Sequence, residues 1–167
     1  MRKDATIGVF AIEDEKEILR LLAQAGLPTE DLTLDKLKNF LVAKPEESSL
    51  IGAIGVELYG DVGLLRSLVV HPSHRGKGIG KSLTHELESL AKQKGVKTLY
   101  LLTTTAADFF THVGYRMIQR ARVPGSIAGT EEFRNICPVS AVCLFKDLVP
   151  AEASHPAGCS GRVMRRD

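Results

Sequence analysis

The chain lacks the features that mark secreted, membrane-spanning and metal-binding proteins. Only three cysteines occur in 167 residues, without the short spacing of zinc ligands, so we expect neither a disulfide framework nor a bound metal. The first ten residues, MRKDATIGVF, contain no apolar core of signal-peptide length. No segment approaches the roughly 20 apolar residues that span a bilayer. These absences predict a protein of a reducing compartment, most simply the cytoplasm, with no membrane partner.

Clustered charge of one sign is also missing. The 22 basic and 20 acidic residues leave a net charge of +2, whereas nucleic-acid-binding chains carry a clustered basic excess, so we expect no nucleic-acid partner. A hydrophobic content of 44% suits one domain with its own core. We expect residues 1–148 to form that domain, and the Pro- and Gly-rich residues 149–167 to be a disordered tail.

The hydrophobic pattern predicts a mixed α/β domain. The early strands follow one another through turns, whereas the later strands alternate with helices, which predicts a central mixed, twisted sheet with helices on both faces. The longest helix carries an apolar stripe at helical spacing from Ile79 to Ala91. Strands are expected at residues 5–12, 40–44, 49–59, 63–70, 98–104, 115–120 and 140–147.

A glycine-rich loop, RGKGIGKS, directly precedes that helix. It ends like a P-loop, but the first glycine of a P-loop would fall on Arg75. The dinucleotide-binding pattern also fails, because its third glycine would fall on Lys81 or Leu83. Both nucleotide-binding interpretations therefore miss by one residue.

The same loop still suits an anion. Glycines let the main chain approach a ligand closely, and the N-terminus of a helix carries about half a positive charge. Arg75, Lys77 and Lys81 add side-chain charge, and a nest of this kind fits a pyrophosphate. The alternative is an ordinary glycine-rich turn with solvated cations.

Two stretches of the chain resemble the GNAT family of N-acetyltransferases. LVVHPSHRGKGIGKSL matches the family's R-x-x-G-x-G segment, and AADFFTHVGY matches a downstream motif with Phe110, Gly114 and Tyr115 in register. The resemblance covers about residues 7–148 and implies a GNAT-like acyl-CoA N-acyltransferase fold with acetyl-CoA as co-substrate. It also implies that the pyrophosphate of acetyl-CoA is bound by Arg75, Gly76, Lys77, Gly78, Ile79, Gly80 and Lys81.

Further stretches, GLPTEDL, ELYGDVGLLRSLVV and LYLLTTTA, resemble the arsenic-resistance branch of that family. Members related to this branch act on glutamate or on glutamate-like phosphinic or arsinic amino acids, so the resemblance implies a small-molecule primary amine as acceptor. A homodimer is left open. Two other functions also stay open: a protein or peptide N-acetyltransferase of the same fold, and a non-catalytic acetyl-CoA-binding module.

The resemblance assigns roles to residues beside the loop. The main chain of Leu68, Val69 and Val70 is expected to pair with the pantetheine arm, and the amide of Leu68 is the candidate oxyanion donor. Thr103 is expected either to touch the pantetheine arm or to cap the next helix.

The departing thiolate lacks the family's usual proton donor. Phe110 occupies the position of a tyrosine that often serves as general acid, and phenylalanine cannot donate a proton. Tyr100 and Tyr115 are candidate substitutes, although a thiolate that leaves unaided, or that takes a proton from water, is the favoured interpretation. Phe110 would then keep only a packing contact with the coenzyme.

Acetyl transfer to an amine also needs a base, because the amine must be neutral to attack. Glu57 is the candidate, since it lies in the apolar stretch IGAIGVELY beside the expected acetyl site. The alternative is that Glu57 is a solvent-facing edge residue. Arg66 either binds a carboxylate of the substrate or neutralises Glu57. Cys137 and Cys143 have no obligatory geometry for arsenic, and Cys143 is expected to be a small buried residue.

Overall fold

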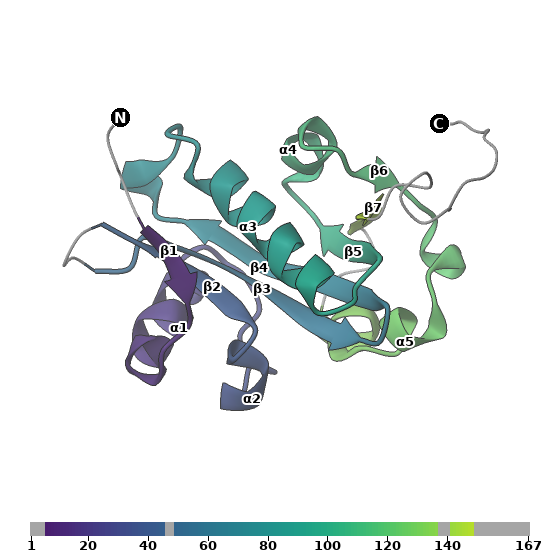
Figure 1. Ribbon diagram of the computed structural model, residues 1–167, viewed down its shortest axis with the longest axis horizontal. Coiled ribbons are helices and arrows are strands. Elements are labelled where there is room, and N and C mark those ends of the chain that lie inside the picture. The colour runs from purple at the N-terminus through teal and green to yellow at the C-terminus, as the bar shows by residue number, and fades with distance from the viewer. Residues whose placement is uncertain (1–5, 46–48, 137–140, 149–167) are drawn as a thin grey trace.

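The computed structural model describes residues 6–45, 49–136 and 141–148. Within these residues the chain forms one seven-stranded sheet in the order β1-β2-β3-β4-β5-β7-β6, with helices on both faces (Figure 1). The predicted tail, residues 149–167, and Cys137 lie outside the described residues. The strands are β1 Thr6–Val9, β2 Phe40–Lys44, β3 Gly52–Tyr59, β4 Val62–Val70, β5 Thr98–Thr103, β6 Arg116–Met117 and β7 Val142–Asp147. The helices are α1 Glu15–Gln24, α2 Leu34–Leu37, α3 Ile79–Gln93, α4 Ala107–His112 and α5 Gly125–Ala128, with short turns η1 Ile12–Asp14, η2 Pro72–His74, η3 Arg120–Arg122 and η4 Glu132–Ile136.

The sheet is mixed, as the order of elements predicts. Strands β1 to β4 pair antiparallel in sequence order, and β5, β7 and β6 also pair antiparallel. Among the strands of the described residues, only β4 and β5 pair in parallel. A parallel pair needs a long crossover connection, and the glycine loop with α3 provides it (Figure 1).

The core is divided by the sheet. On one face, α3 buries Ile79, Leu83, Leu87 and Ala91, the stripe expected from the sequence, against the sheet together with Phe110 of α4. On the other face, α1 and α2 cover one cluster of buried side chains, and α5 with η4 covers a second. The two clusters on this face are separated along the sheet, and the polar residues described below lie between them.

A β-bulge interrupts β4 in its second half. Ala53 pairs with Val69 and Gly55 with Arg66, so Ile54 of β3 faces two residues of β4 instead of one. The extra residue is Ser67, whose φ of 62° lies in the left-handed region that non-glycine residues seldom adopt. The bulge shifts the alternation of the strand by one residue. Leu65 therefore shares the α3 face with Leu68 and Val70, whereas Leu64, Arg66 and Val69 face the other side.

We predict that Gly55→Ala destabilises the fold. A Cβ at this position would lie 2.2–2.5 Å from three ring carbons of the buried Phe40, so ring and strand must move. Overpacking of this kind costs about 1–3 kcal/mol, measurable by urea unfolding. Gly8→Ala is the control, because a Cβ there meets nothing within 4 Å. Equal stability of the two variants would contradict the prediction.

Candidate functional site

Strands β4 and β5 separate in the first half of β4, just before the bulge. They pair only from Val62↔Thr98 to Leu64↔Tyr100. Beyond that point β4 continues to Val70 beside β3, and β5 continues to Thr103 beside β7. The second half of β4 therefore has no strand partner on its β5 side within the described residues.

The register decides which main-chain groups of β4 face this opening. The N–H of His71 donates to the carbonyl of Ile51 at 2.7 Å, which makes this antiparallel pair a hydrogen-bonded one. Because hydrogen-bonded and non-bonded pairs alternate, Val69 also bonds to β3, whereas Leu68 and Val70 direct their N–H and C=O groups away from it. Of the three residues expected to pair with a pantetheine arm, Leu68 and Val70 therefore face the opening and Val69 does not.

The glycine loop presents a row of main-chain donors. Gly76 and Gly78 have φ of 82° and 83°, and a Cβ at either would meet nothing within 4 Å, so they face open space. Gly78 caps α3 in the left-handed conformation. None of the N–H groups of residues 76–81 donates to an acceptor in the described part of the chain. These donors converge at the positive end of a four-turn helix, which is the arrangement that binds phosphate.

The loop itself and its flanking segments carry only positive charge. Residues 62–85 contain no Asp or Glu, and the side chains of Arg75, Lys77 and Lys81 are exposed. Arg75 folds back so that its Nε donates to the carbonyl of Val70 at 3.0 Å, which ties the loop to the free edge of β4. The opening between β4 and β5 and the anion-binding loop are therefore continuous.

The aromatic residues of α4 lie on the α3 side. Phe110 is buried and packs edge-to-face against Phe109 at 5.0 Å and Tyr115 at 5.5 Å between ring centroids. The half-buried Phe109 comes closer to the loop, since a Cβ on Gly80 would lie 3.7 Å from its ring. Phe109 is thus a candidate contact for a bound ligand that the sequence motif did not single out.

The tyrosines proposed as proton donors have other partners. Tyr115 is buried, and its hydroxyl donates to Glu88 at 2.9 Å, while Lys146 binds the same carboxylate at 3.1 Å. Burial and the charge of Glu88 raise the pKa of Tyr115, so this hydroxyl is a poor acid. Tyr100 stacks on Phe145 in the cluster below α5, and burial raises its pKa. These contacts do not favour either tyrosine as the proton donor to a thiolate.

Thr103 stabilises the turn before α4, whereas the cap of the helix itself is Ala106. The hydroxyl oxygen of Thr103 accepts hydrogen bonds from the N–H groups of Ala106 at 2.9 Å and Thr105 at 3.3 Å. Thr103 therefore closes the turn that leads into α4. The side chain is half-buried, so a contact with a pantetheine arm stays a prediction.

On the opposite face, Arg66 lies at the centre of a buried ionic cluster. Its side chain is 1% exposed, and each of its three nitrogens has a carboxylate oxygen within 3.3 Å. Asp31, from the loop between α1 and α2, binds both terminal nitrogens at 2.6 and 2.9 Å. Glu57 of β3 binds one of these nitrogens at 2.7 Å, and Glu132 of η4 lies 3.3 Å from Nε. These contacts support the interpretation that Arg66 neutralises Glu57.

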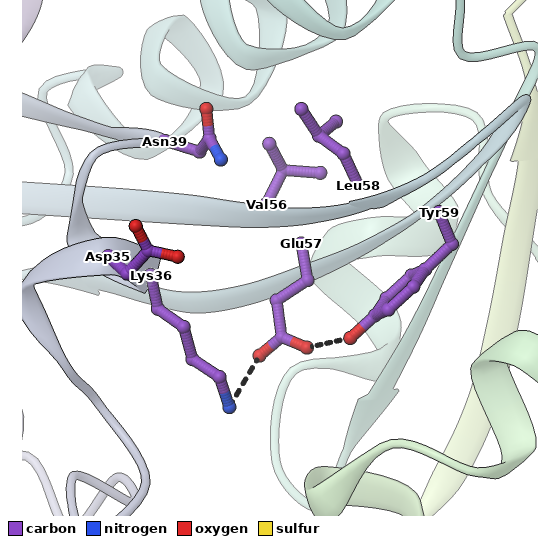
Figure 2. Close-up of a pocket in the computed structure, with 7 residues that line it drawn as sticks. All are labelled: Asp35, Lys36, Asn39, Val56, Glu57, Leu58 and Tyr59. Atoms are coloured by element: carbon purple, nitrogen blue, oxygen red, sulfur yellow. Dashed lines mark hydrogen bonds and ion pairs between the residues drawn. The ribbon is translucent and has the colours of Figure 1, made fainter.

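Glu57 lies beside a cavity that opens to solvent. The cavity has a volume of about 190 Å³ and is lined by Asp35, Lys36, Asn39, Val56, Glu57, Leu58 and Tyr59 (Figure 2). The carboxylate accepts a hydrogen bond from the Tyr59 hydroxyl and lies 3.6 Å from the Lys36 ammonium. Its side chain is only 7% exposed, so the alternative of a solvent-facing edge residue is wrong.

The pKa values of Asp31 and Lys36 are shifted by their partners in this cluster. Burial by itself would raise the pKa of Asp31, but the hydrogen bonds from Arg66 and Lys36 outweigh it and lower that pKa to about 2. Burial would lower the pKa of Lys36, but its bond to Asp31 at 2.9 Å and the charge of Glu57 raise it. Both residues are therefore ionised at neutral pH, which keeps Arg66 paired.

Sequence reasoning missed Asp31, Lys36 and Glu132. Each lies in a polar stretch, GLPTEDL, LDKL or TEEFRN, where a charged residue carries no periodic signal of burial. Only the unexpected arginine in the apolar run LLRSLVV indicated that countercharges must exist, because a buried cation is costly without partners.

Other predicted features are simpler. Cys143 is buried among apolar side chains, and burial raises its pKa to about 11, so it is an unreactive thiol. Within the described ranges no group of three or more His, Cys, Asp or Glu is arranged to hold a metal ion. No helix in the same ranges is both long and apolar enough to cross a membrane.

The fold and the loop define the class of protein. Residues 36–117 match the family model of the acetyltransferase (GNAT) domain. The chain therefore contains a GNAT domain, and its mixed seven-stranded sheet is the GNAT acyl-CoA N-acyltransferase fold.

Sequence relatives include an amino-acid acetyltransferase of Pseudomonas fluorescens, 29% identical over 133 residues, covering 74% of this chain and 30% of that protein. An uncharacterized N-acetyltransferase of Chlorobaculum tepidum is 30% identical over 95 residues, covering 56% of this chain and 60% of that protein. The chain spans about a third of the length of the amino-acid acetyltransferases that it matches.

Solved structures with the same fold are more distant in sequence. N-acetylglutamate synthase from Neisseria gonorrhoeae, complexed with coenzyme A and N-acetyl-glutamate, superposes with a TM-score of 0.76 at 17% identity, covering 89% of this chain and 36% of that one. A GNAT-family acetyltransferase from Staphylococcus aureus superposes with a TM-score of 0.70 at 18% identity, covering 86% of this chain and 99% of that one. At these identities the likeness supports the fold.

We predict that Gly78→Asp weakens binding of coenzyme A by at least ~100-fold, because it strains the helix cap and adds negative charge among the free N–H groups. Isothermal titration measures the affinity. Gly60→Asp is the control, since Gly60 has a similar φ of 72° and open space but lies at the opposite end of β4. Unchanged affinity in Gly78→Asp would refute an anion site here.

We also predict a pH-dependent stability contribution from Asp31. Its pKa in the folded protein is about 2, below the ordinary value of 3.8, so the stabilisation is fully present above pH 4 and is lost as pH falls toward 2. Asp31→Asn should therefore lower the free energy of unfolding by about 2 kcal/mol at pH 6. The difference from wild type should shrink below pH 4 in urea titrations. A difference that stays constant from pH 6 to 3 would contradict this assignment.

Proposed function

We propose that the chain is an acetyl-CoA-dependent N-acetyltransferase that acts on the primary amine of a small molecule. The observation that carries this proposal is the row of N–H groups at residues 76–81 that donate to no acceptor in the described residues. They lie in the loop that follows the part of β4 that does not pair with β5. The GNAT domain match and the coenzyme A complexes of structural neighbours support it independently.

The chain's own groups fit the coenzyme. The N-terminus of α3 and the side chains of Lys77 and Lys81 bind the pyrophosphate by charge-assisted hydrogen bonds. The N–H and C=O groups of Leu68 and the N–H of Val70 hold the pantetheine arm as an added strand, whereas the carbonyl of Val70 already accepts from Arg75. When bound, acetyl-CoA supplies the activated acetyl group as a thioester.

The N–H of Leu68 is the proposed oxyanion donor. It is a main-chain donor on the open edge of β4, immediately after the bulge. The pairs Gly55↔Arg66 before it and Ala53↔Val69 after it hold it against β3. A donor of this kind needs no reorganisation as negative charge develops, which is why it stabilises a transition state strongly.

Glu57 is the proposed base. Its carboxylate is buried on the face opposite α3. It accepts a hydrogen bond from Arg66, which in turn donates to the hydroxyl of Ser67 in the bulge. Both carboxylate oxygens already accept hydrogen bonds from Tyr59 and Arg66, so an acceptor amine must replace one of them or transfer its proton through an intervening water. The adjacent cavity supplies a route for that proton to solvent.

The general acid is proposed to be solvent or absent. Phe110 cannot donate a proton, and the hydroxyl of Tyr115 is bonded to Glu88. A thiolate has a pKa of about 8.5, so it can leave without protonation.

The identity of the acceptor is a narrower hypothesis. Amino-acid acetyltransferases among the sequence relatives support an amino-acid-like amine, and the arsenic-resistance resemblance suggests glutamate or its phosphinic and arsinic analogues. The occupied guanidinium of Arg66 removes one reason to expect an acidic substrate, since its nitrogens already bind Asp31 and Glu57. Cytoplasmic location and a homodimer stay predictions.

Turnover of acetyl-CoA with a panel of amines tests the function. Glutamate, its phosphinic and arsinic analogues, simple amino acids and polyamines are supplied in turn, and thiol release is measured. Acetylation of a small amine supports the proposal. Tight coenzyme binding without turnover on any amine would favour a non-catalytic binding module, and turnover on peptides alone would favour a protein acetyltransferase.

We predict that Glu57→Gln lowers kcat on the order of 100-fold while coenzyme A still binds with wild-type affinity. The reason is that glutamine fills the same space and still accepts hydrogen bonds but cannot take a proton. The dependence of kcat on pH should change in the same variant. Wild-type rates across pH would eliminate Glu57 as base.

A further inference from the structure

Asp31 binds Arg66 in the geometry of a bound carboxylic acid ligand. Two oxygens of one carboxylate face the two terminal nitrogens of the guanidinium at 2.6 and 2.9 Å, which is the bidentate arrangement that arginine uses to recognise carboxylates. Asp31 comes from the loop between α1 and α2, thirty-five positions before Arg66 in the chain. Its side chain is 7% exposed, so the contact lies just beneath the surface.

Asp31 is not needed to neutralise Arg66. Glu57 and Glu132 also lie against the guanidinium, at 2.7 and 3.3 Å. Without Asp31, these two carboxylates still face the single positive charge of Arg66. Asp31 therefore fills a carboxylate-binding position that charge neutrality alone does not require.

We propose that Asp31 is a specificity-determining residue that occupies the carboxylate position on Arg66 and so selects against acceptors that present a carboxylate there. The proposal rests on the proposed function, because it concerns the acceptor side of the same site. Arg66 and Glu57, the proposed base, share a hydrogen bond at 2.7 Å, so a carboxylate on Arg66 would place its own molecule next to the base. Asp31 keeps that position closed.

Asp31→Ala is the variant that opens the position. It removes the carboxylate but leaves Glu57 and Glu132 against Arg66, so we expect it to fold. Asp31→Asn is the second variant, which keeps the side-chain volume and removes only the charge. Glu30→Ala is the matched control, because Glu30 is the exposed neighbouring acid of the same loop and its carboxylate accepts from the N–H of Thr29.

The first measurement needs no catalysis. Sodium acetate is added in place of sodium chloride at equal ionic strength, and Tm is recorded. Acetate should raise the Tm of Asp31→Ala by about 2–4 °C and leave wild type and Glu30→Ala unchanged. The double variant Asp31→Ala with Arg66→Lys should lose this response, because lysine keeps the charge but not the planar pair of donors. Acetate responses that are equal in wild type and Asp31→Ala would overturn the proposal.

The second measurement compares acceptors. Asp31→Ala should lower KM for glutamate about 10-fold relative to KM for an amine of similar length without a carboxylate, such as 1,3-diaminopropane. An unchanged ratio between the two acceptors would also overturn the proposal. If no amine of the panel is turned over by any variant, the proposed function fails, and the acetate response of Tm, repeated with glutamate, still decides whether Asp31 blocks a carboxylate site.

Discussion

The β-bulge at Ser67 is the constraint on which the rest of the site depends. One extra residue in β4 shifts the side-chain alternation, so that Arg66 and Val69 face one side of the sheet and Leu68 and Val70 the other. A bulge also bends and twists its strand, and β4 parts from β5 just before this point. The left-handed conformation of Ser67 is the cost of that arrangement, and strand pairing on β3 holds it in place.

The two faces of the sheet divide the work of the site. On the α3 face, main-chain N–H groups and exposed cationic side chains suit a phosphorylated ligand. On the opposite face, the charges are side chains, and they are buried and paired.

The buried cluster also joins the two smaller cores. Asp31 belongs to the loop after α1, and Glu132 to η4, so Arg66 ties the segment under α1 and α2 to the segment under α5. A buried ion pair contributes little stability by itself, because desolvation offsets much of the attraction. The effect of the cluster is to fix the positions of segments that are far apart in the chain.

The sequence by itself determined the strand and helix order, the glycine loop and the class of ligand that such a loop binds. These features are local, because glycine positions, capping and hydrophobic periodicity depend on neighbours in the chain. Only the tertiary structure decided that Asp31 and Glu132 surround Arg66, that Tyr115 is bonded to Glu88, and that Phe109 approaches Gly80. Those partners are distant in sequence, and a polar residue in a loop carries no local sign of whether a buried countercharge will meet it.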